Sequence, residues 1–195
     1  ALPLRIVGQQ ALLRRDAPRQ GVEEQFMTKA RDARFWNLIA NRYSKLKIGD
    51  EAAYREKLRL TRVHLTPESQ VLEFGCGTGG TARLHAPFVR HILAVDISDK
   101  MIAIARQRAA DEGIGNVSFE VASIDDIGTD RTYDAVLGMS ILHLLDNRKE
   151  VIGKVYDCLK PGGVFVSSTT CLGTGPLMLR LALPLARPVR TAVPD

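Results

Sequence analysis

A short apolar run that ends in a glycine cluster constrains the fold of this chain more than any other feature. Gln70–Phe74 (QVLEF) has the length and composition of a buried strand, and residues 75–80 (GCGTGG) follow it directly. Glycines permit a sharp strand-to-helix turn and let a ligand approach the backbone closely. The amides of a helix that starts there favour negative charge. The pattern predicts a strand, a tight turn and a helix, with or without a bound ligand.

Four more short apolar segments predict further strands, and segments of helical period lie between them. These strands are His91–Asp96, Val117–Val121, Tyr133–Gly138 and Val164–Thr169. One helix is expected to start at Ser98 as its N-cap and to stop at Gly113. Strands that alternate with helices predict an α/β fold with a doubly wound, Rossmann-like parallel sheet. Ligands of such sheets bind at the carboxyl ends of the strands.

Another helix is expected from about Asp146, before the last strand. The residues that it is expected to bury are Val151, Ile152, Val155, Tyr156 and Leu159. Residues 161–163 (PGG) then predict a turn, with proline at its second position and glycine at its third.

Two helices are also predicted before the sheet. Apolar residues at helical spacing predict the first over residues 29–44: Phe35, Trp36, Ile39, Ala40 and Tyr43. The second covers about residues 51–65, and Pro67 prevents its continuation. We expect residues 1–28 to be an N-terminal extension, disordered or, as the alternative, a transit-like leader; they lack the apolar region of a secretory signal. Residues 29–195 are expected to form one domain in which these helices cover the site.

Composition excludes several functional classes. The net charge is +5, but the basic residues are spread along the chain with no run interleaved with aromatics, which disfavours nucleic-acid binding. The three cysteines are widely spaced and form no Cys/His cluster, so no metal site is expected. Reduced cysteines, and the absence of an apolar run long enough to span a bilayer, are typical of a cytoplasmic protein.

Three residues bear on the choice of cofactor. The glycine spacing from Gly75 also satisfies the dinucleotide fingerprint, and Asp96, roughly 20 residues further on, can accept hydrogen bonds from both hydroxyls of a ribose. Both features fit a dinucleotide as well as S-adenosylmethionine. Glu73 separates the two, because an acid beneath the loop can hold the ammonium group of S-adenosylmethionine but would oppose a pyrophosphate.

Five ordered segments carry a resemblance to a known family. VLEFGCGTGGTA at 71–82 resembles motif I of the class I S-adenosylmethionine-dependent methyltransferases. The resemblance continues through VDIS at 95–98, ASIDDI at 122–127, YDAVLGMSILHLL at 133–145 and LKPGGVFV at 159–166. FWNLIANRYSK at 35–45 resembles the helix that covers the cofactor in small members. The resemblance spans about residues 29–172 and implies a methyltransferase with S-adenosyl-L-methionine as cofactor.

The resemblance also implies the residues that contact the cofactor. They are Tyr43, Glu73, Gly75, Cys76, Gly77, Gly79, Asp96, Ile97, Met101, Ser123, Ile124, Met139 and Ser140. Glu73 and the glycines are expected at the methionine portion, and Asp96 at the ribose. Many relatives carry an acid where this chain has Ser123, so its hydroxyl or the neighbouring Asp125 is expected to bind the adenine amine. Tyr43 either closes over the cofactor or packs on its helix face.

The acceptor is less well defined than the cofactor. No Asn-Pro-Pro-Tyr-like motif follows the fourth strand, which favours a small-molecule or lipid-like acceptor over amide or nucleic-acid nitrogen. His143 is the candidate general base, with a packing role as the alternative. Two alternative functions stay open: a nicotinamide-dependent oxidoreductase and a non-catalytic protein that binds S-adenosylmethionine. A homo-oligomer is compatible with either.

The C-terminal segment departs from the family pattern. The family adds a helix and two closing strands after the fifth strand, but four prolines interrupt the residues after Thr170: Pro176, Pro184, Pro188 and Pro194. We therefore expect a five-stranded sheet whose C-terminal strand pair is missing or truncated. Residues 177–190 are expected to pack as a helix on the open edge. The alternative is an interfacial segment that contacts a membrane or a lipophilic acceptor.

Overall fold

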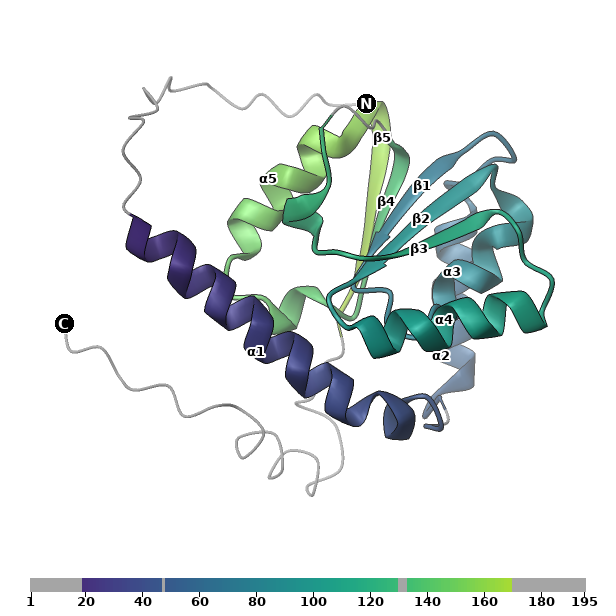
Figure 1. Ribbon diagram of the computed structural model, residues 1–195. Coiled ribbons are helices and arrows are strands. Elements are labelled where there is room, and N and C mark those ends of the chain that lie inside the picture. The colour runs from purple at the N-terminus through teal and green to yellow at the C-terminus, as the bar shows by residue number, and fades with distance from the viewer. Residues whose placement is uncertain (1–18, 47, 130–132, 170–195) are drawn as a thin grey trace.

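One parallel sheet of five strands organises the chain (Figure 1). The computed structural model describes residues 19–46, 48–129 and 133–169. The expectations for residues 1–18 and 177–190 therefore lie outside the described residues. The strands are β1 (Gln70–Phe74), β2 (His91–Asp96), β3 (Val117–Val121), β4 (Tyr133–Met139) and β5 (Leu159–Ser168).

The strand order, β3-β2-β1-β4-β5, is that of a doubly wound sheet. The chain enters at the centre with β1, moves out to β3, and then returns to the other side of β1 with β4. The order therefore reverses between β1 and β4, and ligands of such sheets bind in the crevice at this switch point. The predicted α/β class and the parallel, Rossmann-like sheet are confirmed, and β5 is an edge strand of the described sheet.

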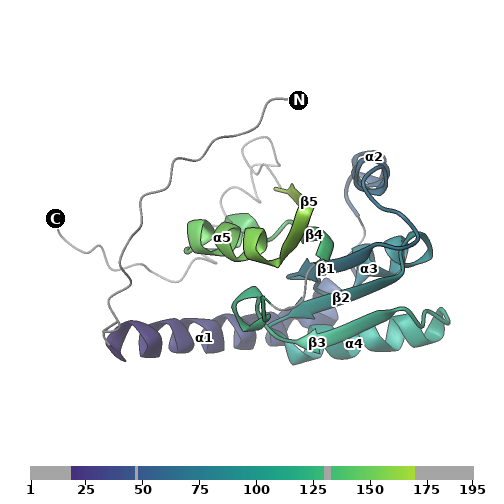
Figure 2. The ribbon, with the colours of Figure 1, turned by 90° about the horizontal axis from the view of Figure 1, so that it is seen from above.

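Helices cover the sheet on both faces (Figure 2). On one face lie α3 (Gly80–His85) and α4 (Asp99–Asp111), and α5 (Arg148–Cys158) lies on the other. Three short 3-10 turns complete the connections: η1 (Ala86–Phe88), η2 (Ile124–Asp126) and η3 (Leu142–Leu144). Each face has its own apolar core, built from alternate residues of the central strands. Burial on both faces explains why these strands are almost uninterrupted apolar runs in the sequence.

The first helix, α1 (Arg19–Tyr43), is longer than predicted. It includes residues 19–28, which were expected to belong to the disordered extension. Its start follows Pro18 immediately, and residues 22–34 contain no glycine or proline that would interrupt a helix. The helix runs diagonally past the carboxyl ends of the strands (Figure 1). The second helix, α2 (Glu51–Arg62), ends earlier than predicted and packs on α3.

The burial predicted for α5 is wrong in part. Val151 and Val155 are buried, but Ile152 is 47% exposed and Tyr156 is 78% exposed. Val151, Val155 and Cys158 form one stripe, at a spacing of four and three residues, that faces the sheet. Ile152 and Tyr156 each follow a residue of that stripe, so they lie about 100° further around the helix.

The last strand also starts earlier than predicted. The chain passes from α5 at Cys158 directly into β5 at Leu159, rather than entering the strand at Val164. The pairing of β4 with β5 is interrupted between Tyr133 and Ala135, where residues 160–163 bulge out of the strand. Gly162 has a φ of 81°, the left-handed conformation expected at the third position of the predicted turn. No helix within the described ranges is long and apolar enough to cross a membrane.

Candidate functional site

A pocket of about 640 Å³ lies at the carboxyl ends of β1, β2 and β4, beside the switch point. Ten residues predicted from the sequence line it: Tyr43, Gly75, Gly77, Asp96, Ile97, Met101, Ser123, Ile124, Met139 and Ser140. Asp125, the predicted alternative to Ser123, also lines it, as do residues that were not named as cofactor contacts: Lys29, Asp32, Trp36, Phe74, Ala122, Ile141, Leu144, Leu145, Asp146, Asn147, Glu150 and Val151. Glu73, Cys76, Gly79 and His143 do not line it.

The glycine loop after β1 forms one wall. Gly75 and Gly77 have φ values of 64° and 54°, which a residue with a Cβ rarely adopts. A Cβ at Gly75 would lie 2.7 Å from a side-chain carbon of Ile141, and one at Gly77 would lie 3.8 Å from the ring of Tyr43. The loop therefore presents bare backbone to the pocket at both positions.

Gly79 serves a different purpose from the one predicted. Its φ is 72°, but a Cβ there would lie 2.8 Å from the Phe119 ring and 3.0 Å from the Cβ of Ala105. This glycine allows the loop to pack against α4 and β3, so its backbone is not part of the pocket wall. Cys76 is also buried away from the pocket, and its backbone amide donates to the carbonyl of Val95.

Asp96 ends β2 and has its carboxylate fixed at the pocket wall. One oxygen, Oδ2, accepts from the backbone amide of Gly77 at 2.8 Å, and Oδ1 accepts from that of Ser98 at 2.9 Å. Burial raises the pKa of Asp96 above its ordinary value, and the two backbone hydrogen bonds oppose that rise. Each carboxylate oxygen keeps a further lone pair, so the group can accept hydrogen bonds from a ligand.

Glu73 lies beneath the loop, as predicted, but behind the pocket wall. Only 2% of the residue is exposed, and its Oε2 has no hydrogen-bond partner among the described residues. Burial raises the pKa of Glu73 to about 8; the positive charge of Lys57 lowers it and the negative charge of Asp96 raises it. Burying a carboxyl group without a hydrogen-bond partner costs free energy. A cation bound at the loop would stabilise the charged form of this group.

The loop after β3 forms the opposite end of the pocket. Lys29 of α1 donates to Ser123 Oγ at 2.9 Å and forms an ion pair with Asp125 at 2.8 Å. The Ser123 hydroxyl also donates to Asp126, which caps η2. This hydroxyl is therefore held on two sides, and Asp125 brings a second carboxylate to the pocket beside it.

One face of α1 closes the pocket. Lys29, Asp32, Trp36 and Tyr43 all line it; Tyr43 was predicted as a cofactor contact, and Trp36 was predicted only as part of the covering helix. Their spacing of three, four and seven residues places them on one side of a helix, a signal that the sequence contains. Of the two helices expected to cover the site, α2 contributes no lining residue.

Hydrogen bonds hold α1 in place. Asn37 accepts from Ser98 Oγ at 2.5 Å and donates to Asp99, at the start of α4. Further along, Arg108 of α4 donates to the carbonyl of Ser44 at 2.6 Å. These bonds join α1 and the residue after it to α4, and the inner face of α1 is a wall of the pocket in this structure.

The remaining wall follows β4. Ser140 has a φ of 57°, a conformation that costs energy for a residue with a side chain and that clusters at functional sites. Ile141, Leu144 and Leu145 add an apolar surface, and Asp146, Asn147 and Glu150 add polar groups. His143 lies within η3, and its Nδ1 is buried with no hydrogen-bond partner among the described residues.

A Rossmann-like sheet with a glycine loop and a ribose-type acid at its switch point defines a cofactor-binding α/β protein. Comparison with known proteins narrows the class. A family described as "Methyltransferase domain" matches residues 71–163. Together with the relatives described next, this match shows that the chain is similar to methyltransferases over its central residues.

Two curated relatives and one solved structure illustrate the similarity. A malonyl-[acyl-carrier protein] O-methyltransferase of Bacillus cereus is 33% identical, over 53% of this chain and 38% of that protein. A demethylmenaquinone methyltransferase of Leptospira interrogans is 30% identical, over 68% of this chain and 57% of that protein. The structure of the DhpI–SAH complex matches with a TM-score of 0.59 and 29% identity, covering 71% of this chain and 68% of that one. The chain therefore spans only part of the length of these two relatives.

Proposed function

We propose that this protein binds S-adenosyl-L-methionine in the pocket and transfers its methyl group to a small-molecule or lipid-like acceptor. The observation that carries the proposal is the Asp96 carboxylate, which two backbone amides fix at the pocket wall beside the glycine loop. A fixed acid at this place suits the two hydroxyls of a ribose. The similarity to methyltransferases favours S-adenosylmethionine over a nicotinamide dinucleotide.

The lining residues fit the other parts of this cofactor. Ile97 and Met101 supply apolar surface for an adenine ring, and Asp125 supplies a carboxylate for its amine. Gly75 and Gly77 leave room for the methionine portion. Glu73 lies behind them with an oxygen that has no partner in the described residues; its raised pKa keeps it protonated at neutral pH, and a bound ammonium group would favour its charged form, directly or through water.

The acceptor side of the pocket follows β4 and faces α1. Trp36, Ile141, Leu144 and Leu145 offer an apolar surface there, which suits the hydrocarbon part of a lipid-like acceptor. The relatives named above include enzymes for a quinone and for an acyl-carrier-protein thioester, and both names are compatible with such an acceptor.

The sulfonium of S-adenosylmethionine supplies an already activated methyl group. The protein's own residues therefore have to orient the acceptor and exclude water. Ser140 is held in a strained conformation at the end of β4, and Ile141 follows it. Both line the pocket where the proposed cofactor side meets the proposed acceptor side. His143 is our candidate for the group that takes a proton from the acceptor. It has to turn from its buried position to reach the pocket.

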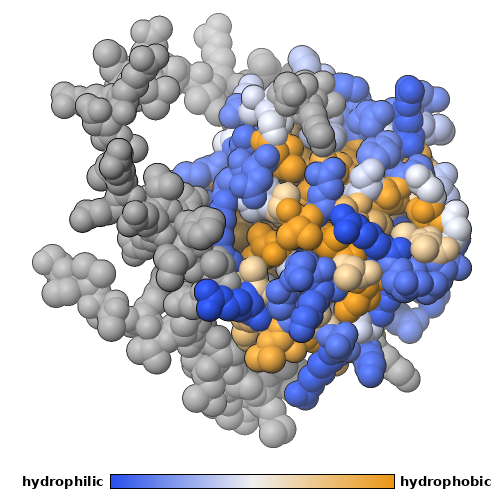
Figure 3. All heavy atoms as spheres, viewed as in Figure 1, coloured by the Kyte–Doolittle hydropathy of each residue, from blue (hydrophilic) through white to orange (hydrophobic). Residues whose placement is uncertain are grey.

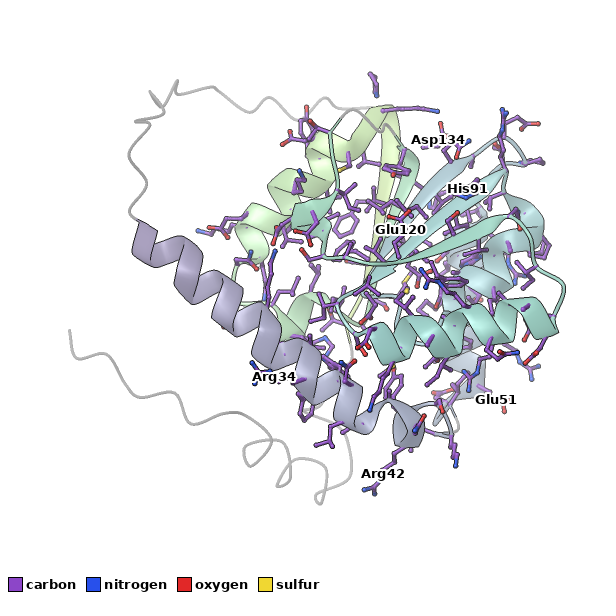
Figure 4. All side chains as sticks on the ribbon, viewed as in Figure 1. Arg34, Arg42, Glu51, His91, Glu120 and Asp134 are labelled. Carbon is purple, nitrogen blue, oxygen red and sulfur yellow. The ribbon has the colours of Figure 1, made fainter. Side chains whose placement is uncertain are left out.

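Asp96→Ala should weaken the binding of S-adenosylmethionine by about 1–3 kcal/mol, because charge-assisted hydrogen bonds to the ribose are lost. Isothermal titration calorimetry measures the change directly. Asp134→Ala is the control, since Asp134 lies at the amino end of β4, away from the pocket (Figure 4), and pairs with Lys160. Unchanged affinity in Asp96→Ala would contradict the assignment of the ribose site.

Transfer itself is tested with cofactor that carries a labelled methyl group. We expect label in at least one member of a panel of hydroxylated quinones, phenols and carboxylic acids, detected by mass spectrometry of the extracted products. Binding of the cofactor without label in any acceptor would favour the alternative of a non-catalytic binding protein.

A further inference from the structure

The solvent side of α1 carries exposed apolar residues that the domain does not use. Leu38 is 82% exposed and Phe35 is 45% exposed, and just after the helix Leu46 and Ile48 are 65% and 48% exposed. Isolated exposed apolar residues are common on proteins, but here four lie within fourteen positions of one segment. Figure 3 shows apolar atoms exposed among hydrophilic ones on the face of the molecule that includes α1.

The same side of α1 is basic. Arg34, Arg42 and Lys45 are exposed, and residues 33–49 contain no aspartate or glutamate. Arg34 and Arg42 both point away from the domain (Figure 4). We call Arg34, Phe35, Leu38, Arg42, Lys45, Leu46 and Ile48 the α1 outer face. It combines positive charge with large apolar side chains, the composition of helices that lie in the surface of anionic membranes.

The position of α1 makes this face relevant to the pocket. Its inner side lines the pocket through Lys29, Trp36 and Tyr43. Asn37 accepts a hydrogen bond from Ser98 and donates one to Asp99, which holds α1 against the start of α4, so the outer face is directed to solvent. A helix with its side chains is about 10 Å across. A surface that contacts the outer face would therefore lie within about one helix diameter of the pocket.

We propose that the α1 outer face binds the surface of an anionic lipid bilayer and so brings the pocket to a membrane-dissolved acceptor. The proposal rests on the proposed function, because it assigns the acceptor to the lipid class. Lys and Arg near such a surface are attracted by its negative potential, and Phe and Leu enter the boundary between headgroups and acyl chains.

A bilayer fits this face better than an acidic protein partner does. The apolar side chains are spread along the helix and beyond its end, with basic residues between them, rather than gathered around a central depression. Protein interfaces concentrate their binding energy in a few residues that fit pockets of the partner. A fluid surface makes no such demand, because it adapts to each side chain.

Co-flotation of the full chain with vesicles tests the proposal. We expect at least roughly tenfold tighter binding to vesicles with anionic phosphatidylglycerol than to neutral phosphatidylcholine vesicles, with the preference lost at high salt. Arg34→Glu with Arg42→Glu should abolish the preference, and Leu38→Gln should weaken binding several-fold. The matched controls are Arg90→Glu and Leu60→Gln, an exposed basic residue and an exposed apolar residue on other elements.

Calorimetric titration of the same variants with S-adenosylmethionine separates the two proposals. Unchanged cofactor affinity with lost vesicle binding supports both. If the unaltered chain binds the cofactor but not the vesicles, the proposed membrane-binding role of the α1 outer face is wrong and the proposed function still stands. The same holds if the cofactor binds and all variants bind the vesicles equally. Absent cofactor binding overturns the function instead. If the variants lose binding to an acidic acyl-carrier protein while vesicles do not bind, the face is a protein-docking surface and the inference is wrong.

Discussion

Gly79→Ala is expected to lower the free energy of unfolding by about 2–5 kcal/mol, the sum of backbone strain and overpacking. Gly79 has a φ of 72°, in the left-handed region that costs energy for a residue with a Cβ. The added methyl group would also lie 2.8 Å from the ring of Phe119 and 3.0 Å from Ala105, closer than real Cβ contacts. Both neighbours belong to the core, so neither can move away cheaply.

Gly113→Ala is the matched control for this substitution. Its φ of 68° is almost the same, but nothing lies within 4 Å of the added Cβ. It should therefore show only the backbone strain, about 1–2 kcal/mol. Urea denaturation of both variants measures the difference. Equal losses would mean that the loop, α4 and β3 do not pack as described.

Glu73→Gln is expected to remove a large pH dependence of stability. Burial raises the pKa of Glu73 to about 8 in the folded chain, from its ordinary value of 4.5. The folded chain thus keeps a proton that the unfolded chain releases between these two values. The contribution of this carboxyl group to the free energy of unfolding is fully present below pH 4.5 and is lost as the pH rises towards 8. The glutamine variant should gain several kcal/mol relative to the unaltered chain between pH 5 and pH 8, by the same linkage.

The comparison uses the difference between the two chains at each pH. Burial also lowers the pKa of His85, to about 4, so its contribution is lost as the pH falls; it is common to both chains and cancels in the difference. Glu120→Gln is the control, because Glu120 is an exposed glutamate on β3 (Figure 4). A difference between Glu73→Gln and the unaltered chain that does not vary with pH would show that the Glu73 carboxyl is not buried as described.

Much of the fold was predictable because the strands are buried on both faces. β1 and β2 match their predicted bounds, since each is a buried apolar run that ends at a glycine or an acid. β3 also matches its predicted bounds, although polar residues alternate with its apolar ones. The errors occur where one element leads directly into the next. Nothing in the sequence around Cys158 and Leu159 marks the change from α5 to β5, and the predicted turn at 161–163 is a bulge within the strand.

The site was predictable to the extent that its residues follow strands. Asp96, Ile97, Met139 and Ser140 come at or just after the ends of β2 and β4, and all four line the pocket. On α1, Tyr43 was predicted, but Lys29 and Asp32, which share its face, were missed. Their contact with the pocket depends on where α1 docks, which local sequence does not specify.

The sequence also does not show towards which side of the loop a single residue faces, and this limited the prediction of its role. Gly79 belongs to the same motif as Gly75 and Gly77, but its missing side chain makes room for Phe119 rather than for a ligand. Glu73 has the buried position that was expected, yet the loop separates it from the pocket surface. Spacing along the chain identifies a motif, and only the packing around it shows which side each residue serves.

The most direct test of the account is a pair of calorimetric titrations of the unaltered chain, one with S-adenosylmethionine and one with NAD. We predict binding of S-adenosylmethionine at one site per chain, and weaker or undetectable binding of NAD, because the acids that line the pocket oppose a pyrophosphate. Binding of NAD with higher affinity than S-adenosylmethionine would contradict it and would restore the oxidoreductase alternative.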